Sequence, residues 1–220
     1  MKFYVTTCKC WGKSNISSTK NFFEKMKTNV IKDSGIVLAS NNKGKLREFL
    51  ALLSKSNIKI FPQSDFKIKE VEEDGLSFVE NALKKARNAS LVSGKPAIAD
   101  DSGIEVDALN GAPGIHSARY STIGSEIENN IKLLGALKNV KEENRGARYQ
   151  CVIVFLKYAH DPMPIICHGT WEGKILREPR GRNGFGYDPL FFIPDLNMTA
   201  AELSEEQKNQ HSHRAKALKS

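Results

Sequence analysis

The sequence predicts an α/β fold built around a mixed β-sheet. From residue 35 onward, short apolar runs typical of strands alternate with helical patterns, and the second half of the chain carries mostly strand-like runs. Alternation favours parallel strands joined by helices, whereas successive strands favour antiparallel pairing, so the two together indicate a mixed sheet. The long run at 148–158, rich in Val, Ile, Phe and Tyr, is expected to cross the centre of that sheet.

The first predicted unit is a strand, a polar loop and a helix. The apolar residues at 36–39 form the strand, and those of 46–53 recur at the i, i+3, i+4, i+7 spacing of a helix with one apolar face. Further helices are expected to begin at Ser77 and Ser125, because each serine has a glutamate three residues later, as in a capping box.

The other strand candidates are short runs rich in apolar or β-branched residues. They lie at 58–61, 66–71, 97–100, 104–109, 164–171, 173–177 and 190–193. Near the end of the sequence, Ser204 opens a last helix. On one continuous helix Lys208 and His213 would lie roughly 140° apart. Their cooperation therefore requires a helix break near 210–211, with Ser212 capping a new helix.

Composition and charge exclude some classes of protein. The 220 residues are 40% hydrophobic and 26% charged, which is ordinary for a soluble globular chain. No apolar run approaches the roughly 18 residues that a membrane helix needs. Of the net charge of +8, residues 1–34 carry +5, which leaves about +3 for the rest. We therefore expect no membrane or nucleic-acid partner, and the alternative is nucleic-acid binding by the basic N-terminal segment.

One folded domain is expected at 34–220, preceded by a polar, basic extension at 1–33 in which Met26 is an alternative start position. The chain has four cysteines: Cys8, Cys10, Cys151 and Cys167. They are too few and too unevenly spaced for a disulfide framework, which favours a reducing, cytoplasmic setting. The two in the extension lack a second Cys or His pair at the spacing of a zinc site.

The loop after the first strand suits an anion. Its residues are Ser40, Asn41, Asn42, Lys43, Gly44 and Lys45. The loop lies at a helix N-terminus, where free N–H groups and the helix dipole favour negative charge, and its two lysines suit a polyphosphate. The alternative is a solvated turn in which an asparagine caps the helix.

Two adjacent carboxylates, Asp100 and Asp101, follow the apolar run at 96–99. In a strand their side chains point to opposite faces, so both serve one site only if the strand ends between them. We expect one to bind a cation or activate water and the other to support the backbone, and the alternative is an Asp-Ser-Gly turn. A nearby acidic run offers a further oxygen ligand or is simply solvated: Glu70, Glu72, Glu73 and Asp74.

A third candidate segment follows the glycine-containing stretch at 180–184. It consists of Phe185, Gly186, Tyr187, Asp188 and Pro189. Two aromatic rings and a carboxylate on a flexible stretch are suited to stacking on a flat base and hydrogen bonding to it. The alternative is a turn with Phe185 packed in the interior.

Taken in order, these segments resemble those of the inosine triphosphate pyrophosphatase family, from about Ile36 to Leu218. The matching motifs lie at 39–45, 78–82, 98–103, 111–120, 184–189 and 201–203, and at Lys208 with 212–214. One departure is Asn41, where many members have glycine. Asparagine is tolerable there because it also adopts left-handed turns.

The resemblance implies a two-lobed α/β fold with a central curved sheet, a cleft between the lobes and a homodimer. It also implies Mg²⁺-dependent hydrolysis of ITP, dITP and XTP to the monophosphate and pyrophosphate, which keeps deaminated purines out of DNA and RNA. The nearer alternative is a nucleotide pyrophosphatase of the septum-inhibitor type, acting on pyrimidine or methylated nucleotides. The element formed by His213 and Arg214 argues against that alternative.

The resemblance also implies roles for residues. Asp101 would be metal ligand and general base, and Glu72, or its neighbour Glu73, would be the second metal ligand. The loop from Ser40 to Lys45 would cradle the triphosphate, and Ser102 would contact the nucleotide. The base and phosphates would be held by Phe185, Gly186, Tyr187, Asp188, Lys208, His213 and Arg214. Donors on the last two would pair with the 6-oxo group that hypoxanthine and xanthine carry in place of the amino group of adenine.

Overall fold

The computed structural model describes residues 35–56 and 58–220. The predicted extension at 1–33, with Cys8 and Cys10, lies outside these residues. Within them, one seven-stranded sheet has the order β2-β1-β3-β4-β5-β6-β7. The strands are β1 (Ile36–Leu38), β2 (Ile60–Pro62), β3 (Ala97–Val106), β4 (Gly146–Leu156), β5 (Ile165–Ile175), β6 (Phe191–Ile193) and β7 (Met198–Thr199). β1 pairs in parallel with β2 and β3 and the other neighbours are antiparallel, which confirms the mixed sheet.

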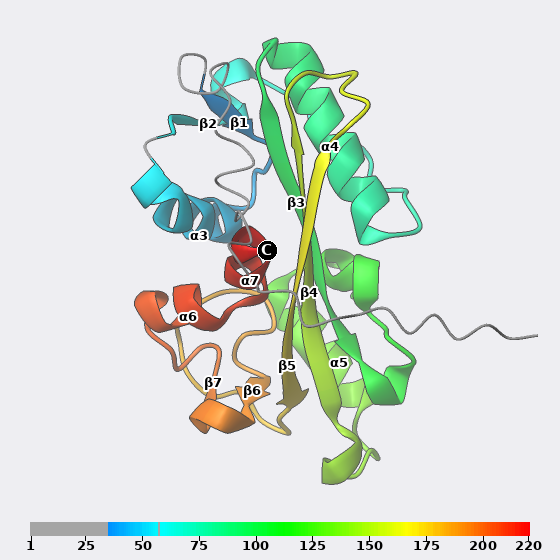
Figure 1. Ribbon diagram of the computed structural model, residues 1–220. Helices are drawn as coiled ribbons and strands as arrows, with labels where there is room; N and C mark the ends of the chain where they lie inside the picture. The colour runs from blue at the N-terminus through cyan, green and yellow to red at the C-terminus, as the bar shows by residue number, and fades with distance from the viewer. Residues whose placement is uncertain (1–34, 57) are drawn as a thin grey trace, which may run out of the picture.

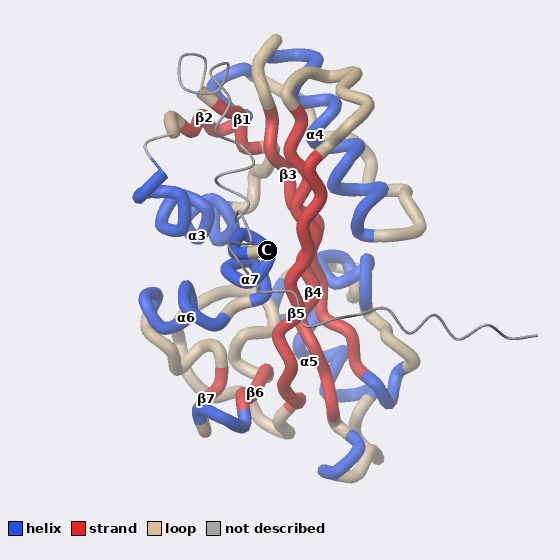
Figure 2. The backbone as a smooth tube through the Cα atoms, in the orientation of Figure 1, coloured by secondary structure: helices blue, strands red, loops and turns tan. Residues whose placement is uncertain are grey.

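Helices lie on both sides of the long strands. In the described residues they are α3 (Lys43–Leu53), α4 (Phe78–Ser93), α5 (Glu126–Ala136), α6 (Glu205–His211) and α7 (His213–Lys219). Figure 1 shows β3, β4 and β5 running along the molecule, with α4 on one side and α3, α6 and α7 on the other. In Figure 2 these strands twist about one another. The run predicted for the centre of the sheet is β4, between β3 and β5. No described helix has both the length and the apolar character needed to cross a bilayer.

The two faces of the sheet bury different apolar clusters. On β3, Ile98 belongs to the cluster that contains Phe49 of α3. Ala97 and Ala99 belong instead to the cluster that contains Ala86 of α4. Because both faces are covered, the strands at this end read as continuous apolar runs. Asp100 and Asp101, the next residues of β3, follow the same alternation, so their side chains face different helices.

Several strand predictions were wrong in their bounds. The runs at 97–100 and 104–109 belong to one uninterrupted strand, β3, which ends at Val106, and residues 107–109 form a 3-10 turn. The runs at 164–171 and 173–177 are likewise a single strand, β5. Asp100 and Asp101 do not interrupt β3, because each carboxylate finds a cationic partner on a helix.

The predicted strand at 66–71 does not form. A short 3-10 helix (Gln63–Phe66) occupies its start, and Lys67 then adopts a left-handed φ of 53°. The N–H of Lys67 binds the carbonyls of Gln63 and Ser64, so the chain turns there instead of extending. The following residues run as an irregular loop to α4.

The predicted helix starts are confirmed. Ser77, Ser125 and Ser204 are the N-caps of α4, α5 and α6, and each hydroxyl accepts a hydrogen bond from the N–H three residues later. The expected break before the last helix is also present. α6 ends at His211, and Ser212 caps α7 by accepting from the N–H of Ala215 at 3.2 Å.

Candidate functional site

A cavity of about 700 Å³ lies beside β3 where β1 ends. β1 pairs with β3 only as far as Ile98, so beyond that residue both faces of β3 can reach the cavity. The predicted residues in its wall are Ser40, Asn41, Asn42, Lys45, Glu70, Glu72, Glu73, Asp101, Ser102, Phe185, Gly186, Tyr187, Asp188, Lys208, His213 and Arg214. Lys43 and Gly44 belong to the same loop but are not part of this wall. The fold thus brings together segments that are far apart in the sequence.

The loop at 40–45 is shaped by its own polar side chains. Asn42 is the N-cap of α3, and its Oδ1 accepts from the N–H of Lys45 at 3.0 Å. The Ser40 hydroxyl accepts from the N–H of Asn42 at 3.2 Å, and Asn41 Nδ2 donates to Glu70 at 2.8 Å. The first turn of α3 has no acidic residue. Its N-terminus therefore remains electropositive and suited to phosphate.

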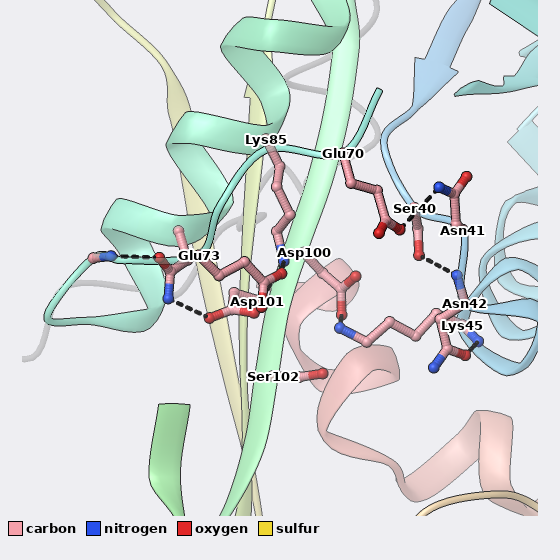
Figure 3. Close-up of polar contacts among 12 residues, drawn as sticks. Ser40, Asn41, Asn42, Lys45, Glu70, Glu73, Lys85, Asp100, Asp101 and Ser102 are labelled. Atoms are coloured by element: carbon pink, nitrogen blue, oxygen red, sulfur yellow. Dashed lines mark hydrogen bonds and ion pairs between the residues drawn. The ribbon is translucent and has the colours of Figure 1, made fainter. Parts of the chain in front are cut away.

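Asp100 is a buried ion-pair partner on the side of α3 and α7. Its carboxylate lies 3.1 Å from Lys45 Nζ and 2.8 Å from Arg214 Nη2. Burial disfavours the charged form, but the two cations outweigh it and hold the pKa of Asp100 well below its ordinary value. Asp100 therefore stays ionised and fixes two cations at the cavity. Figure 3 shows it directed toward Lys45.

Asp101 faces α4, on the opposite side of the strand. Its Oδ1 lies 3.0 Å from Lys85 Nζ, and its Oδ2 accepts from Asn81 Nδ2 at 3.3 Å. Burial raises the pKa of Asp101 above its ordinary value, although the charge of Lys85 opposes this. The predicted divergence of the two carboxylates is confirmed (Figure 3). A cavity-lining carboxyl with a raised pKa is a candidate general base.

Lys85 links Asp101 to Glu73. Its Nζ is 2.7 Å from Glu73 Oε1, and Glu73 Oε2 accepts from Arg119 Nη1 at 3.1 Å. Glu72 also lines the cavity, but its side chain is exposed, and it is Glu73 that is joined to Asp101 through Lys85. Two carboxylates therefore lie on one wall of the cavity, with a single ammonium between them.

Asp188 holds the loop at 185–188 from inside. Its carboxylate accepts from the N–H of Phe185 at 2.9 Å and from the Tyr149 hydroxyl at 3.2 Å, and it pairs with Lys208. Burial raises the pKa of Asp188 although Lys208 opposes this. The centroid of the Phe185 ring lies 4.6 Å from Lys208 Nζ. The ring also packs closely against Gly44, where an added Cβ would lie 2.5 Å from a ring carbon. Phe185 thereby connects the loop at 40–45 to the opposite wall.

Glu48 of α3 joins the cations of the last two helices. Its Oε1 lies 2.8 Å from Lys208 Nζ, and its Oε2 pairs with Arg214 Nη1. Arg214 is fully buried, and its Nη2 also donates to Ser102 Oγ at 3.1 Å. These contacts keep α3, α6 and α7 together on one side of the cavity.

His213 stacks on Tyr149, with ring centroids 4.7 Å apart and an interplanar angle of 11°. Burial and the nearby charges of Arg214 and Lys208 lower the pKa of His213 well below its ordinary value. The imidazole is therefore neutral at physiological pH. Among the described residues, neither His213 Nδ1 nor Arg214 Nε has a hydrogen-bond partner. Buried polar atoms without partners are uncommon, and a bound ligand can satisfy them.

Several residues of the site were given no role from the sequence, namely Glu48, Asn81, Lys85, Arg119 and Tyr149. Asn81 and Arg119 lie in the matching motifs at 78–82 and 111–120, which did not say what they contact. Asn81 and Lys85 carried a further signal, because they are polar, four residues apart and beside the apolar face of α4. Glu48 also carried one, since it follows Lys45 by three residues on α3. The partners of Arg119 and Tyr149 come from distant segments and had no local signal.

Comparisons with known proteins agree with the motifs in the sequence. A model of the Ham1 family matches residues 36–220. The dITP/XTP pyrophosphatase of Thioalkalivibrio sulfidiphilus is 59% identical over 185 residues, 84% of this chain and 94% of that protein. The protein of the same name from Pseudomonas aeruginosa is 53% identical over 189 residues, with 86% and 95% covered. The structure of a HAM1 protein from Coxiella burnetii has a TM-score of 0.78 at 49% identity, covering 84% of this chain and 94% of that chain.

Proposed function

The chain belongs to the Ham1 family, and on this premise we propose that it is a nucleoside-triphosphate pyrophosphatase for dITP, XTP and ITP. Its products would be the monophosphate and pyrophosphate. Relatives named dITP/XTP pyrophosphatase support this substrate class. By removing deaminated purine nucleotides from the pool, the enzyme would keep them out of DNA and RNA.

The observation that carries the proposal is the position of Asp101. Its carboxyl has a raised pKa, lies beside the ammonium of Lys85 and faces a cavity whose other wall is the N-terminus of α3. A base of this kind takes a proton from water as the water attacks a phosphorus atom. Lys45, with the polar side chains of Ser40, Asn41 and Asn42 at the start of α3, would bind the phosphates, and the lysine would stabilise the charge that develops on leaving pyrophosphate.

The carboxylates fit Mg²⁺, because it prefers oxygen ligands and is usually held by one or two carboxylates with substrate phosphates. Asp101 and an adjacent glutamate would hold the ion. The sequence resemblance favours Glu72, and the contact through Lys85 favours Glu73. When bound, Mg²⁺ would neutralise the polyphosphate and orient it.

We assign selection of the purine base to the cavity wall on the side of β3 that faces α3, α6 and α7. Phe185 offers a ring for stacking, and Ser102, Lys208, His213 and Arg214 surround the same part of the cavity. A 6-oxo group would offer an acceptor to donors there, whereas the amino group of adenine would leave them unpaired. Buried donors left without partners are a strong means of rejecting an analogue.

The test is pyrophosphate release from ITP, dITP, XTP, ATP and GTP, each with Mg²⁺ and with EDTA. We expect metal-dependent turnover that strongly favours ITP, dITP and XTP over ATP. Equal turnover of ATP and ITP would contradict the assignment of the purine site. Absence of turnover on all five nucleotides would overturn the proposed function.

We also propose a homodimer located in the cytoplasm. The family resemblance supports the dimer, and sedimentation velocity at micromolar concentration tests it. The free, buried thiols of Cys151 and Cys167 are compatible with a reducing compartment.

A further inference from the structure

Arg119 donates hydrogen bonds to both the side chain and the backbone of Glu73. Its Nη1 donates to Glu73 Oε2 at 3.1 Å, and its Nη2 donates to the Glu73 carbonyl oxygen at 2.7 Å. The planar fork of a guanidinium can donate to two such acceptors at fixed spacing, whereas the point charge of a lysine cannot reproduce that geometry. Arg119 therefore fixes the orientation of Glu73 as well as its charge environment.

Arg119 is carried by a segment that is itself firmly held. It ends the 3-10 helix η4 (Gly114–Arg119), which β3 and α5 anchor. Ser117 Oγ accepts from the N–H of Ile104 on β3 at 2.8 Å. Asn129 of α5 donates to the carbonyl of Ala118 at 3.1 Å, and Lys132 donates to the carbonyl of Tyr120 at 2.6 Å. The guanidinium thus projects from a rigid support.

Glu73, by contrast, lies on an irregular loop. Among the described residues, the hydrogen bonds that reach 69–75 from the rest of the molecule come from side chains. The carboxylate of Glu73 meets Lys85 on its other side, and Lys85 meets Asp101. Arg119, Glu73, Lys85 and Asp101 consequently form a row of alternating charges along the cavity wall. The position of Glu73 within this row depends on the anchor that Arg119 provides.

We propose that Arg119 is a positioning residue that holds Glu73 in place for the divalent cation and triphosphate. This inference rests on the proposed function and adds a residue to it. The side chains of Arg119 and Glu73 are 42% and 28% exposed. A pair this open to solvent contributes little to the stability of the whole fold. Its effect is therefore local, on the loop at 69–75 and on cation binding.

The test uses Arg119→Ala, Arg119→Lys, Glu73→Gln and the double variant Arg119→Ala with Glu73→Gln. Arg177→Ala is the matched control. The Arg177 side chain also contacts one carboxylate, Glu142, and one backbone carbonyl, that of Val140, but outside the cavity. Three quantities are measured: the backbone order parameters at 69–75 from ¹⁵N relaxation without nucleotide or metal, the Mg²⁺ concentration for half-maximal ITP hydrolysis, and the urea midpoint.

Arg119→Ala is expected to lower the backbone order parameters at 69–75 from the rigid range of about 0.85 toward values below about 0.6. It is also expected to raise the half-maximal Mg²⁺ concentration about 10- to 100-fold, the usual effect of losing a residue that orients a metal ligand. Arg119→Lys should recover only part of this loss, and the urea midpoint should not change. Arg177→Ala should leave all three quantities as in the wild type. In the Glu73→Gln background, Arg119→Ala should raise the half-maximal Mg²⁺ concentration far less than it does in the wild type, because both substitutions act through one carboxylate.

Unchanged order parameters at 69–75 in Arg119→Ala, or losses that multiply independently in the double variant, would overturn the inference. Failure of the proposed function is a separate result, recognised by absence of wild-type turnover on every nucleotide. The relaxation measurement needs neither nucleotide nor metal. It therefore still decides whether Arg119 holds the loop in that case.

Discussion

The contact between β3 and η4 predicts a large effect for Gly103→Ala. A Cβ on Gly103 would lie 2.2 Å from the carbonyl oxygen of Gly114 and 2.5 Å from Ser117 Oγ. Both distances are far below van der Waals contact, and one of the atoms belongs to the backbone. The methyl group therefore forces η4 away from the strand.

The cost can be worked out from the contacts that are disturbed. Overpacking of this kind costs about 1–3 kcal/mol. The Ser117 hydroxyl also accepts from the N–H of Ile104 at 2.8 Å and donates to the Gly114 carbonyl at 2.6 Å. Weakening these bonds adds about 1 kcal/mol. We expect the free energy of unfolding to fall by about 2–4 kcal/mol in total.

Urea denaturation measures this change, with Gly135→Ala as the matched control. Gly135 lies within α5 and an added Cβ there meets no atom within 4 Å. The control should gain about 0.5–1 kcal/mol, since alanine is the better helix former. Pyrophosphate release by Gly103→Ala should also fall, because η4 carries Arg119. A loss below about 0.5 kcal/mol, within the range of ordinary surface substitutions, would refute the close packing of η4 on β3.

Three further substitutions test the site. Asp101→Asn should abolish pyrophosphate release while circular dichroism stays unchanged, because the amide cannot accept the proton; residual turnover near the wild-type rate would exclude Asp101 as the base. Asp100→Asn should lower the free energy of unfolding at pH 7 by about 3–5 kcal/mol, since it strips Lys45 and Arg214 of a buried partner. The pKa of Asp100 is held below its ordinary value, so its contribution is present above the unfolded pKa and is lost as pH falls through the folded pKa. The difference in free energy of unfolding between wild type and Asp100→Asn, measured by urea denaturation, should therefore become smaller below about pH 4. A difference that does not change with pH would contradict this account. His213→Ala should raise ATP turnover relative to ITP, and equal losses for both nucleotides would count against its role in selecting the base.

The sequence allowed accurate prediction of the helix starts, which depend on a local pattern. Ser77, Ser125 and Ser204 each begin a helix as expected, because N-capping depends on residues within one turn. The break at Ser212 followed from helical geometry, since Lys208 and His213 cannot share one face of a continuous helix. Both residues do line the cavity.

Prediction failed where distant charges decide. Asp100 and Asp101 were expected at the end of a short strand. Instead, Lys45, Arg214 and Lys85 supply their partners from three helices, and the strand continues through them. The same limit explains why the motif at 111–120 did not reveal the partner of Arg119, since its acceptors on Glu73 lie 46 positions earlier in the chain.

The pairing of β3 with β4 also determines to which face of the sheet each of the two carboxylates points. A slip of one residue in that pairing would turn every side chain of β3 to the opposite face, so that Asp101 would point away from Lys85 and α4. The ladder runs from Ala97 opposite Leu156 to Val106 opposite Ala147 without a bulge, so a slip would have to break every pair at once. An insertion or deletion in this strand should therefore be far more damaging to the enzyme than one in a surface loop, even where the fold survives.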